Sequence, residues 1–269
     1  MINIILFFIL VVIIIFVNLF IYLFVMNFIN DNINEIYVIN LKKRPERLEL
    51  FKKNYKLIHN YKIIDAIDGN ELIHDKEYIN TIVGTEAKKT LNDFYKYNII
   101  RKYHYELSSY GAIGCYLTHI NVWTEIIKSN KQNALIFEDD AKVSNINYFD
   151  LNKRLRLLPD DWDIYLLINP DFCYLKEPLK NNRNLFKVKR FFLLHAYIIN
   201  INACKKIIEN GKLFPINQQI DHHLSELALI NTLNIYIHDK LPYYNTINQE
   251  SDIQINSAST LSYERFEIR

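Results

Sequence analysis

The sequence contains little glycine, proline or cysteine. Its 269 residues include five Gly and six Pro, so long flexible linkers between domains are not expected. The three cysteines, Cys115, Cys173 and Cys204, are an odd number without a CxxC pair. This pattern fits neither a disulfide framework nor a zinc site, and we interpret the three residues as free thiols.

The sequence also has no large excess of charge of either sign. A formal net charge of +2 argues against a dedicated nucleic-acid-binding protein, which normally carries a strongly basic face. Half of the residues are hydrophobic, and the length suffices for one large α/β domain or two small ones.

Charge is absent altogether from the N-terminal segment. Between Ile4 and Met26 the only clearly polar side chain is Asn18, and the first charge is Asp31. Such a run exceeds the ~20 residues that cross a bilayer, and it lacks the basic start and small-residue cleavage site of a signal peptide. We therefore predict a single-pass membrane anchor at residues 4–26, with a buried core helix or a signal peptide as alternatives. The side of the membrane stays open because no Lys or Arg precedes the span.

Beyond this segment, apolar strand patterns alternate with helical ones, which predicts an α/β domain with a mainly parallel sheet covered by helices on both faces. We place the anchor and a short linker at 1–30, the domain at 31–250 and a tail at 251–269. Short helices and loops are expected at 70–110. The expected strands are 35–41, 61–69, 134–138, 161–168, two short ones within 186–200 that are separated near Phe192, and 233–240. The expected helices are 45–54, 111–130, 147–157, 202–211 and 218–231.

The stretch ALIFEDDAKV at 134–143 carries the strongest chemical signal. A short apolar run ends in Glu138, Asp139 and Asp140, of which the first and third share a face if the strand continues. Ligands of open α/β sheets collect at the carboxyl ends of strands, and carboxylates there can bind a hard cation such as Mg²⁺ or Mn²⁺. The alternative is a solvated loop in which the acids cap the next element.

Several blocks in the same order resemble glycosyltransferase family 25, which includes lipooligosaccharide and collagen galactosyltransferases. They are INLKKRPERLELF (39–51), DAIDG (65–69), GAIGCYLTH (111–119) with Trp123, LIFEDDAKV (135–143), HAYIIN (195–200), QQIDHHL (218–224) and QESDI (249–253). Thr118 stands where the family usually has Ser. The resemblance implies a GT-A-like fold and inverting transfer of a sugar, commonly galactose from a UDP-sugar, to a glycan, glycolipid or protein hydroxyl.

Chemistry agrees with this implication, because a bound Mn²⁺ or Mg²⁺ stabilises the charge on a departing diphosphate and a carboxylate can deprotonate the acceptor. Glu138 and Asp140 are the first metal candidates, with His223 as a further one. Asp139 is a catalytic candidate that would contact the sugar or ribose. Asp221 is a candidate base, metal-side ligand or sugar contact, unless it only complements a helix dipole.

Donor-binding candidates follow the first two strands and open the long helix. Arg44 and Arg47 can bind phosphate, although a solvated basic helix face or a lipid-facing basic patch would also explain them. Asp68 is a nucleotide contact or a turn former, and His119 is a donor contact or a structural residue. The complete donor set is Asn40, Leu41, Arg44, Arg47, Asp68, Gly111 and His119.

Two other functions remain open at this point. A metal-dependent phosphoryl-transfer enzyme would need a further acidic cluster, and the only one is DDWD at 160–163, which we interpret as a loop entering a strand. A membrane-anchored glycosyltransferase fold without activity would serve as a binding module. Binding of UDP that depends on Mn²⁺ would distinguish the transferase from both.

Overall fold

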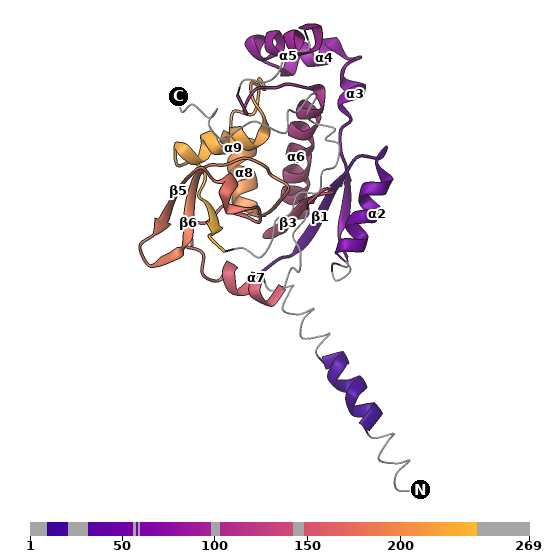
Figure 1. Ribbon diagram of the computed structural model, residues 1–269, viewed down its shortest axis with the longest axis vertical. Helices are drawn as coiled ribbons and strands as arrows, with labels where there is room; N and C mark the ends of the chain where they lie inside the picture. The colour runs from indigo at the N-terminus through magenta and orange to yellow at the C-terminus, as the bar shows by residue number, and fades with distance from the viewer. Residues whose placement is uncertain are drawn as a thin grey trace.

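The protein is built around a single eight-stranded sheet (Figure 1). A computed structural model describes residues 10–20, 32–55, 58, 60–97, 103–141 and 148–240, with the backbone alone for 148 and 149. The strand order across the sheet is β2-β1-β3-β7-β4-β8-β6-β5. The strands are β1 (Glu35–Asn40), β2 (Lys62–Asp65), β3 (Asn133–Glu138), β4 (Ile164–Leu166), β5 (Leu175–Leu179), β6 (Asn182–Arg190), β7 (Ala196–Asn200) and β8 (Ile235–His238).

The sheet is mixed, and the prediction of a mainly parallel sheet is wrong. Of the seven pairings between described strands, β1 with β2, β1 with β3 and β4 with β8 are parallel, and the other four are antiparallel. Parallel neighbours need a long crossover, usually a helix. Between β4 and its antiparallel neighbour β7 the described chain instead forms a short 3₁₀ turn (Pro170–Phe172) and a hairpin.

Helices cover both faces of the sheet, as expected. They are α2 (Pro45–Asn54), α3 (Gly69–Leu72), α4 (Lys76–Ile82), α5 (Thr85–Tyr97), α6 (Tyr110–Ser129), α7 (Tyr148–Leu155), α8 (Ile201–Asn210) and α9 (Ile220–Leu229). Helix α6 packs with α8 and α9 on one face, whereas α2 and α7 cover the other (Figure 1). Alternation along β1 divides the core accordingly: Tyr37 and Ile39 face α6, and Ile36 and Val38 face α2.

Local sequence signals determine where helix α6 begins and ends. Ser109 caps α6, and its hydroxyl oxygen accepts a hydrogen bond from the Ala112 N–H at 3.0 Å. The helix ends at Asn130, which adopts the left-handed conformation with φ of 53°. Near the start of α6 the backbone passes so close to residues 67–69 that a Cβ on Gly114 would lie 2.3 Å from the Ile67 carbonyl oxygen. Only glycine permits this approach.

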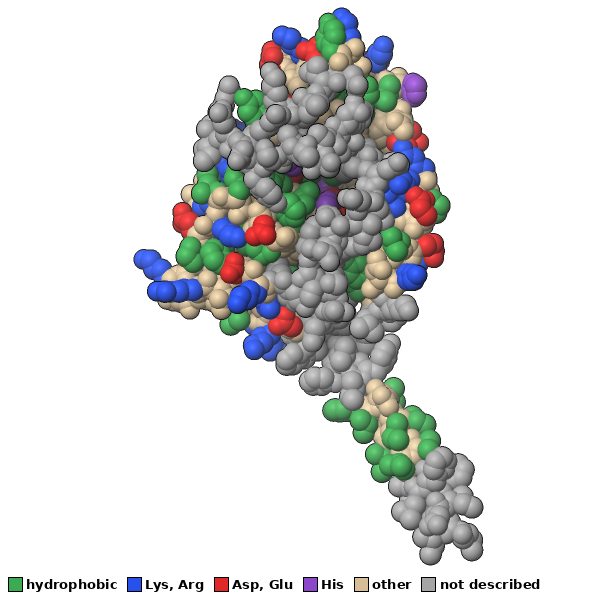
Figure 2. Space-filling view, in the orientation of Figure 1, with side chains coloured by type: hydrophobic (Ala, Val, Ile, Leu, Met, Phe, Trp, Pro, Cys, Tyr) green, Lys and Arg blue, Asp and Glu red, His purple; other side chains and the backbone are tan. Residues whose placement is uncertain are grey.

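The hairpin of β5 and β6 was not predicted as such, because only residues from 186 onward were expected to be a strand. Most residues of its strands are half-buried or exposed. The strands carry basic residues and include Pro178, so they lack the apolar alternation of a strand pattern. Figure 2 shows blue side chains gathered on this hairpin. Charge and proline on an edge strand hinder pairing with other chains.

The membrane-spanning helix predicted for residues 4–26 is wrong, and so is the single-pass membrane localisation inferred from it. Within the described residues, no helix is long and apolar enough to span a bilayer. Residues 1–9 and 21–31, like the tail from 241 with its QESDI block, lie outside the described residues.

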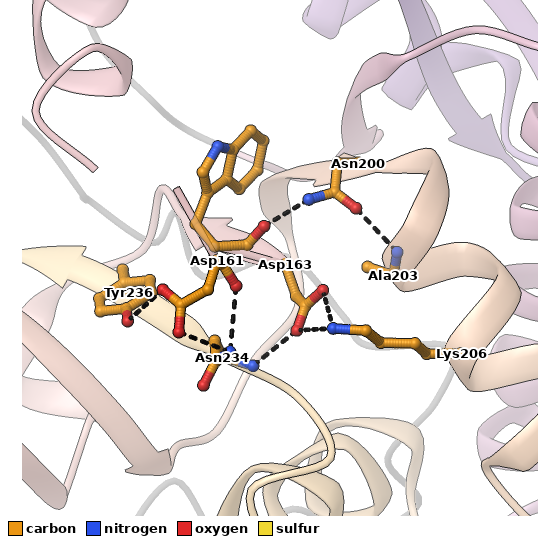
Figure 3. Close-up of polar contacts among 8 residues, drawn as sticks. Asp161, Asp163, Asn200, Ala203, Lys206, Asn234 and Tyr236 are labelled. Atoms are coloured by element: carbon orange, nitrogen blue, oxygen red, sulfur yellow. Dashed lines mark hydrogen bonds and ion pairs between the residues drawn. The ribbon is translucent and has the colours of Figure 1, made fainter. Parts of the chain in front are cut away.

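The second acidic stretch, DDWD, is a structural junction (Figure 3). Asp163 is 1% exposed, and its carboxylate accepts two bonds from Lys206 at 2.7 and 2.8 Å and one from the Asn234 N–H at 2.9 Å. Asp161 accepts bonds from the Asn234 amide and the Tyr236 hydroxyl. These contacts join the start of β4 to β8 and α8.

This junction lies at the opposite end of the sheet from the acidic triplet. The Asn200 N–H bonds the Asp163 carbonyl, and Asn200 pairs with Asn133 at the start of β3. Glu138 ends the same strand, five residues and about 16 Å further on. The two acidic clusters therefore do not form one site.

Replacing Lys206 with Met should lower the free energy of unfolding by about 2 kcal/mol, because the buried Asp163 carboxylate loses its ionic partner. Urea unfolding measures the change. Lys205→Met is the matched control, since Lys205 is exposed on the same helix. Equal effects of the two substitutions would contradict a stabilising role for the Asp163–Lys206 pair.

Candidate active site

The parallel strands β1, β2 and β3 end at the same edge of the sheet, where a cavity of about 230 Å³ opens. The acidic triplet closes its floor, and the first turns of α6 form one wall. The residues that line it include Leu41, Lys43, Arg47, Asp68, Gly111 and His119.

A smaller cavity of about 70 Å³ lies on the other side of the triplet, between α6, the segment after β6 and the start of α9. His104, His195 and Asp221 line it. Three residues, Cys115, Glu138 and Asp140, line both cavities. The acids therefore stand where two separate spaces meet, which is the arrangement needed to bring two reactants together.

The three neighbouring carboxylates face different surroundings. Asp139 points toward α2, accepts a hydrogen bond from the Asn40 amide at 2.6 Å and lies 3.6 Å from the Arg47 guanidinium. Glu138 is buried and lies 3.2 Å from Nε2 of His119. Asp140 has a buried oxygen, Oδ1, with no hydrogen-bond partner among the described residues. A buried carboxylate oxygen without a partner is costly unless a cation or a ligand completes it.

Two groups of side chains near Glu138 could hold a metal ion. Ligand atoms of Glu138, Asp140 and His195 lie within 4.8 Å of one another, and so do those of Cys115, His119 and Glu138. The first group supplies carboxylates and an imidazole, which suit Mn²⁺ or Mg²⁺, and it contains Asp140, whose Oδ1 has no hydrogen-bond partner among the described residues. The residues present thus fit the cation that the sequence led us to expect.

Burial raises the pKa of Glu138 to about 8, an effect that His195 partly offsets and that the neighbouring Asp140 and Asp139 reinforce. Desolvation also lowers the pKa of the fully buried His119 to about 3, so this imidazole is neutral at neutral pH. A cation bound beside Glu138 would favour its ionised form, and binding would release a proton.

Asp221 enters the smaller cavity from the first turn of α9. Its Oδ2 accepts a hydrogen bond from the Leu193 N–H at 3.0 Å, and its Oδ1 accepts one from the His222 N–H at 2.7 Å. Leu193 has a φ of 68°, which a residue with a side chain rarely adopts. Asp221 therefore helps to hold the segment that carries His195, and each of its oxygens keeps a second lone pair for a ligand.

The model of the family described as Glycosyltransferase family 25 (LPS biosynthesis protein) matches residues 33–224, which include both cavities and the triplet. The chain belongs to glycosyltransferase family 25. This confirms the resemblance found in the sequence.

Curated relatives agree with the family. The chain is 29% identical to procollagen galactosyltransferase 1-A of Xenopus laevis over 70% of its own length and 30% of the relative's. It is 27% identical to human procollagen galactosyltransferase 2, over 69% of its length and 29% of the relative's. A rat protein named probable inactive glycosyltransferase 25 family member 3 is 25% identical over 69% of this chain and 32% of that protein. The chain thus spans about a third of the length of these relatives.

Most of the donor-binding residues that the sequence predicted lie at the larger cavity of this family 25 protein. Leu41, Arg47, Asp68, Gly111 and His119 line it. Asp68 also accepts a bond from the Asn70 N–H at 2.9 Å and caps α3, so it is a turn former as well.

Three other predicted residues lie differently. Asn40 contacts Asp139 and the Arg44 carbonyl and is not part of the lining. Arg44 pairs with Glu46 at 2.6 Å. His223 is not in either cavity lining, because its Nε2 lies 2.8 Å from the Gly211 carbonyl oxygen, and the structure does not bring it to the triplet.

Two residues of the site, His195 as a metal candidate and Lys43 as a lining residue, were not predicted from the sequence. His195 reaches Glu138 because its carbonyl accepts the Glu138 N–H at 2.8 Å, where β7 approaches the end of β3. This neighbour depends on an antiparallel pairing that the sequence pattern did not predict. Lys43 was readable from its place beside Arg44 in the basic turn after β1.

The raised pKa of Glu138 predicts how stability depends on pH in the metal-free protein. The folded state holds this proton up to about pH 8, whereas the unfolded chain releases it near the ordinary glutamate pKa of 4.5. The contribution of Glu138 is therefore fully present below the unfolded value and is lost as pH rises through about 8. The free energy of unfolding should fall over this window, and less so in Glu138→Gln.

Denaturant unfolding with a chelator present, at several pH values across that window, measures this difference. The control is Glu209→Gln, because Glu209 is an exposed glutamate of α8. Parallel pH profiles for wild type and Glu138→Gln would refute the assignment of a buried, protonated carboxyl group.

Proposed function

We propose that this chain is a metal-dependent glycosyltransferase that moves a hexose, with galactose as the first candidate, from a UDP-sugar to a hydroxyl acceptor. The acceptor would be a glycan, a glycolipid or a protein. The observation that carries the proposal is the acidic triplet at the junction of two cavities, with the buried Asp140 oxygen left unsatisfied. Family membership and the galactosyltransferase relatives support the choice of reaction and sugar.

Glu138, Asp140 and His195 would hold the cation, in place of the set with His223 that the sequence suggested. When bound, Mn²⁺ or Mg²⁺ supplies positive charge that stabilises the departing diphosphate. The chain itself keeps the third acid, Asp139, occupied by Arg47 and Asn40, so the negative charge at the junction does not accumulate unopposed.

The nucleotide would occupy the larger cavity. Lys43 and Arg47 supply positive charge there, and the N-terminus of the 20-residue helix α6 opens onto it at Tyr110 and Gly111. Cationic side chains and a helix N-terminus both favour phosphate. Lys43 is 2.8 Å from Asp68, so a diphosphate would compete with this carboxylate for the same ammonium group.

The acceptor would enter from the smaller cavity, where Asp221 is the candidate general base. Inversion requires that the acceptor hydroxyl attack from the side opposite the leaving group and lose its proton there. Asp221 lines this cavity together with Glu138 and Asp140, whereas Asp139 is turned toward α2. Of the two catalytic candidates from the sequence, we therefore assign the base to Asp221 and a sugar or ribose contact to Asp139.

The phosphoryl-transfer alternative finds less support. It needs a further acidic cluster near the first. Asp161 and Asp163 of DDWD, however, lie at the opposite end of the sheet and are bonded to Lys206, Asn234 and Tyr236 (Figure 3). The inactive binding module is distinguished by the two experiments that follow.

Asp140→Ala should abolish the binding of UDP that depends on Mn²⁺ while leaving the fold intact, because Asp140 supplies the unsatisfied oxygen. Loss of a residue that only hydrogen-bonds a metal ligand lowers metal affinity by roughly 10–100-fold. Because Asp140 would itself be a ligand, we expect a larger loss of Mn²⁺ affinity. Thermal unfolding with UDP alone, Mn²⁺ alone and both together measures it. Asp160→Ala, an exposed aspartate at the far edge, is the control. Full stabilisation of Asp140→Ala by UDP and Mn²⁺ would refute the metal role.

Asp221→Asn should slow turnover of a UDP-sugar by roughly 10²–10⁴-fold without weakening UDP binding, because a general base acts in the transition state. Metal-dependent hydrolysis of UDP-galactose and other UDP-sugars provides the rate without a known acceptor. Glu226→Gln on the same helix is the control, since Glu226 pairs with Arg190 outside the cavity. An unchanged rate in Asp221→Asn would contradict its assignment as base, and no hydrolysis by the wild type would favour the binding module.

A further inference from the structure

The two candidate metal groups compete for one carboxylate. Glu138 belongs both to the group with Asp140 and His195 and to the group with Cys115 and His119. The second group would suit a thiophilic ion such as Zn²⁺, because it combines a thiol, an imidazole and a carboxylate. Cys115 and His119 are four residues apart on α6 and lie on one helix face.

The direction of a buried chain of hydrogen bonds determines which of the two groups can bind a cation. The Trp123 indole N–H can only donate, so the Tyr197 hydroxyl oxygen, 3.0 Å away, accepts from it. The Tyr197 hydroxyl then has its own proton to place, and its other partner is Nδ1 of His119 at 2.9 Å. All three side chains are fully buried, so a hydroxyl proton without an acceptor would be costly.

Nδ1 of His119 is therefore the acceptor, and the neutral ring carries its proton on Nε2. That nitrogen lies 3.2 Å from Oε1 of Glu138 and donates to it. A protonated Nε2 has no lone pair for a metal ion. The opposite tautomer would free Nε2 for coordination, but it would leave the buried Tyr197 proton without an acceptor among the described residues.

We propose that Trp123, Tyr197 and His119 are positioning residues that fix the His119 tautomer, close the group with Cys115 to cations, and hold Glu138 for the group with Asp140 and His195. His119 occupies one oxygen of Glu138, while Oε2 lies 3.8 Å from Nε2 of His195 on the other side. The cation site thereby takes oxygen and imidazole ligands and excludes the thiol. The inference about the cation site rests on the proposed function, whereas the assignment of the His119 tautomer is independent of it.

The fold brings these three residues together from distant parts of the chain. His119 and Trp123 are one turn apart on α6, and Tyr197 pairs with Ile136 in the antiparallel ladder of β3 and β7. This ladder places the Tyr197 hydroxyl beneath α6, two residues from the end of β3 where Glu138 lies. A shift of the register by one residue would turn Tyr197 to the other face of the sheet.

The first test determines the tautomer in the metal-free wild-type protein. Long-range ¹H–¹⁵N NMR of histidine-labelled protein distinguishes a protonated from an unprotonated ring nitrogen, and loss of the signals in His119→Gln assigns them. We expect Nε2 to be protonated and Nδ1 unprotonated. A proton on Nδ1 would overturn the proposal. This result does not depend on any donor, metal or transferase activity.

The second test uses Co²⁺ as the probe, because a bond from thiolate to Co²⁺ produces a near-ultraviolet charge-transfer band that oxygen and imidazole ligands do not. Wild-type protein should bind Co²⁺ without this band. Tyr197→Phe removes the hydroxyl that fixes the tautomer, so the band should appear, and the double variant with Cys115→Ser should lose it again. A band in the wild type, or none in Tyr197→Phe, would overturn the proposal.

Tyr165→Phe is the matched control. Tyr165 is also fully buried, and its hydroxyl lies 2.9 Å from Nδ1 of a histidine, His238, which belongs to neither candidate metal group. This variant should bind Co²⁺ as the wild type does. If Tyr197→Phe does not fold, the tautomer and the Co²⁺ spectrum of the wild type still decide the proposal. Failure of the wild type to bind Co²⁺ would overturn the cation part together with the metal dependence under the proposed function.

Discussion

The burial of Glu138 at the end of β3, beside two further carboxylates, is the constraint on which the rest of the site depends. Burial and neighbouring like charges disfavour the ionised form of this carboxylate, and they therefore raise its pKa. The surrounding residues offset these effects in separate ways: Arg47 and Asn40 engage Asp139, and the imidazole of His119 donates to Glu138. What remains unsatisfied is the buried Oδ1 of Asp140, a residue that lines both cavities.

Helix α6 connects this constraint to the core. It approaches the segment after β2 closely because Gly114 has no side chain, and from there it extends along one face of the sheet. One face of the helix brings Cys115 and His119 to the acids, and Trp123 anchors the same face in the core. The polar residues that could bind a ligand are therefore held by a packed helix, which keeps them in place without a bound ligand.

Stabilising contacts and the candidate active site lie at opposite ends of the strands. At one end, the Asp163–Lys206 pair joins β4 and α8, and every described carboxylate oxygen of Asp163 has a partner. At the other end, the acids of the triplet line open space. This explains how two acidic stretches of similar appearance in the sequence, DDWD and EDD, serve different purposes. The distinction depends on which end of a strand each occupies.

The sequence by itself determined the order of most strands and helices, the free thiols and the acidic strand end, because these depend on local periodicity, capping and charge. It also carried the family blocks. The tertiary structure decided what depends on pairing between distant segments: the antiparallel β7, the arrival of His195 beside Glu138, and the placement of His223 at Gly211. Apolar strands look alike whichever direction they run. Direction and register follow from packing, and they select which of several plausible side chains reach the acids.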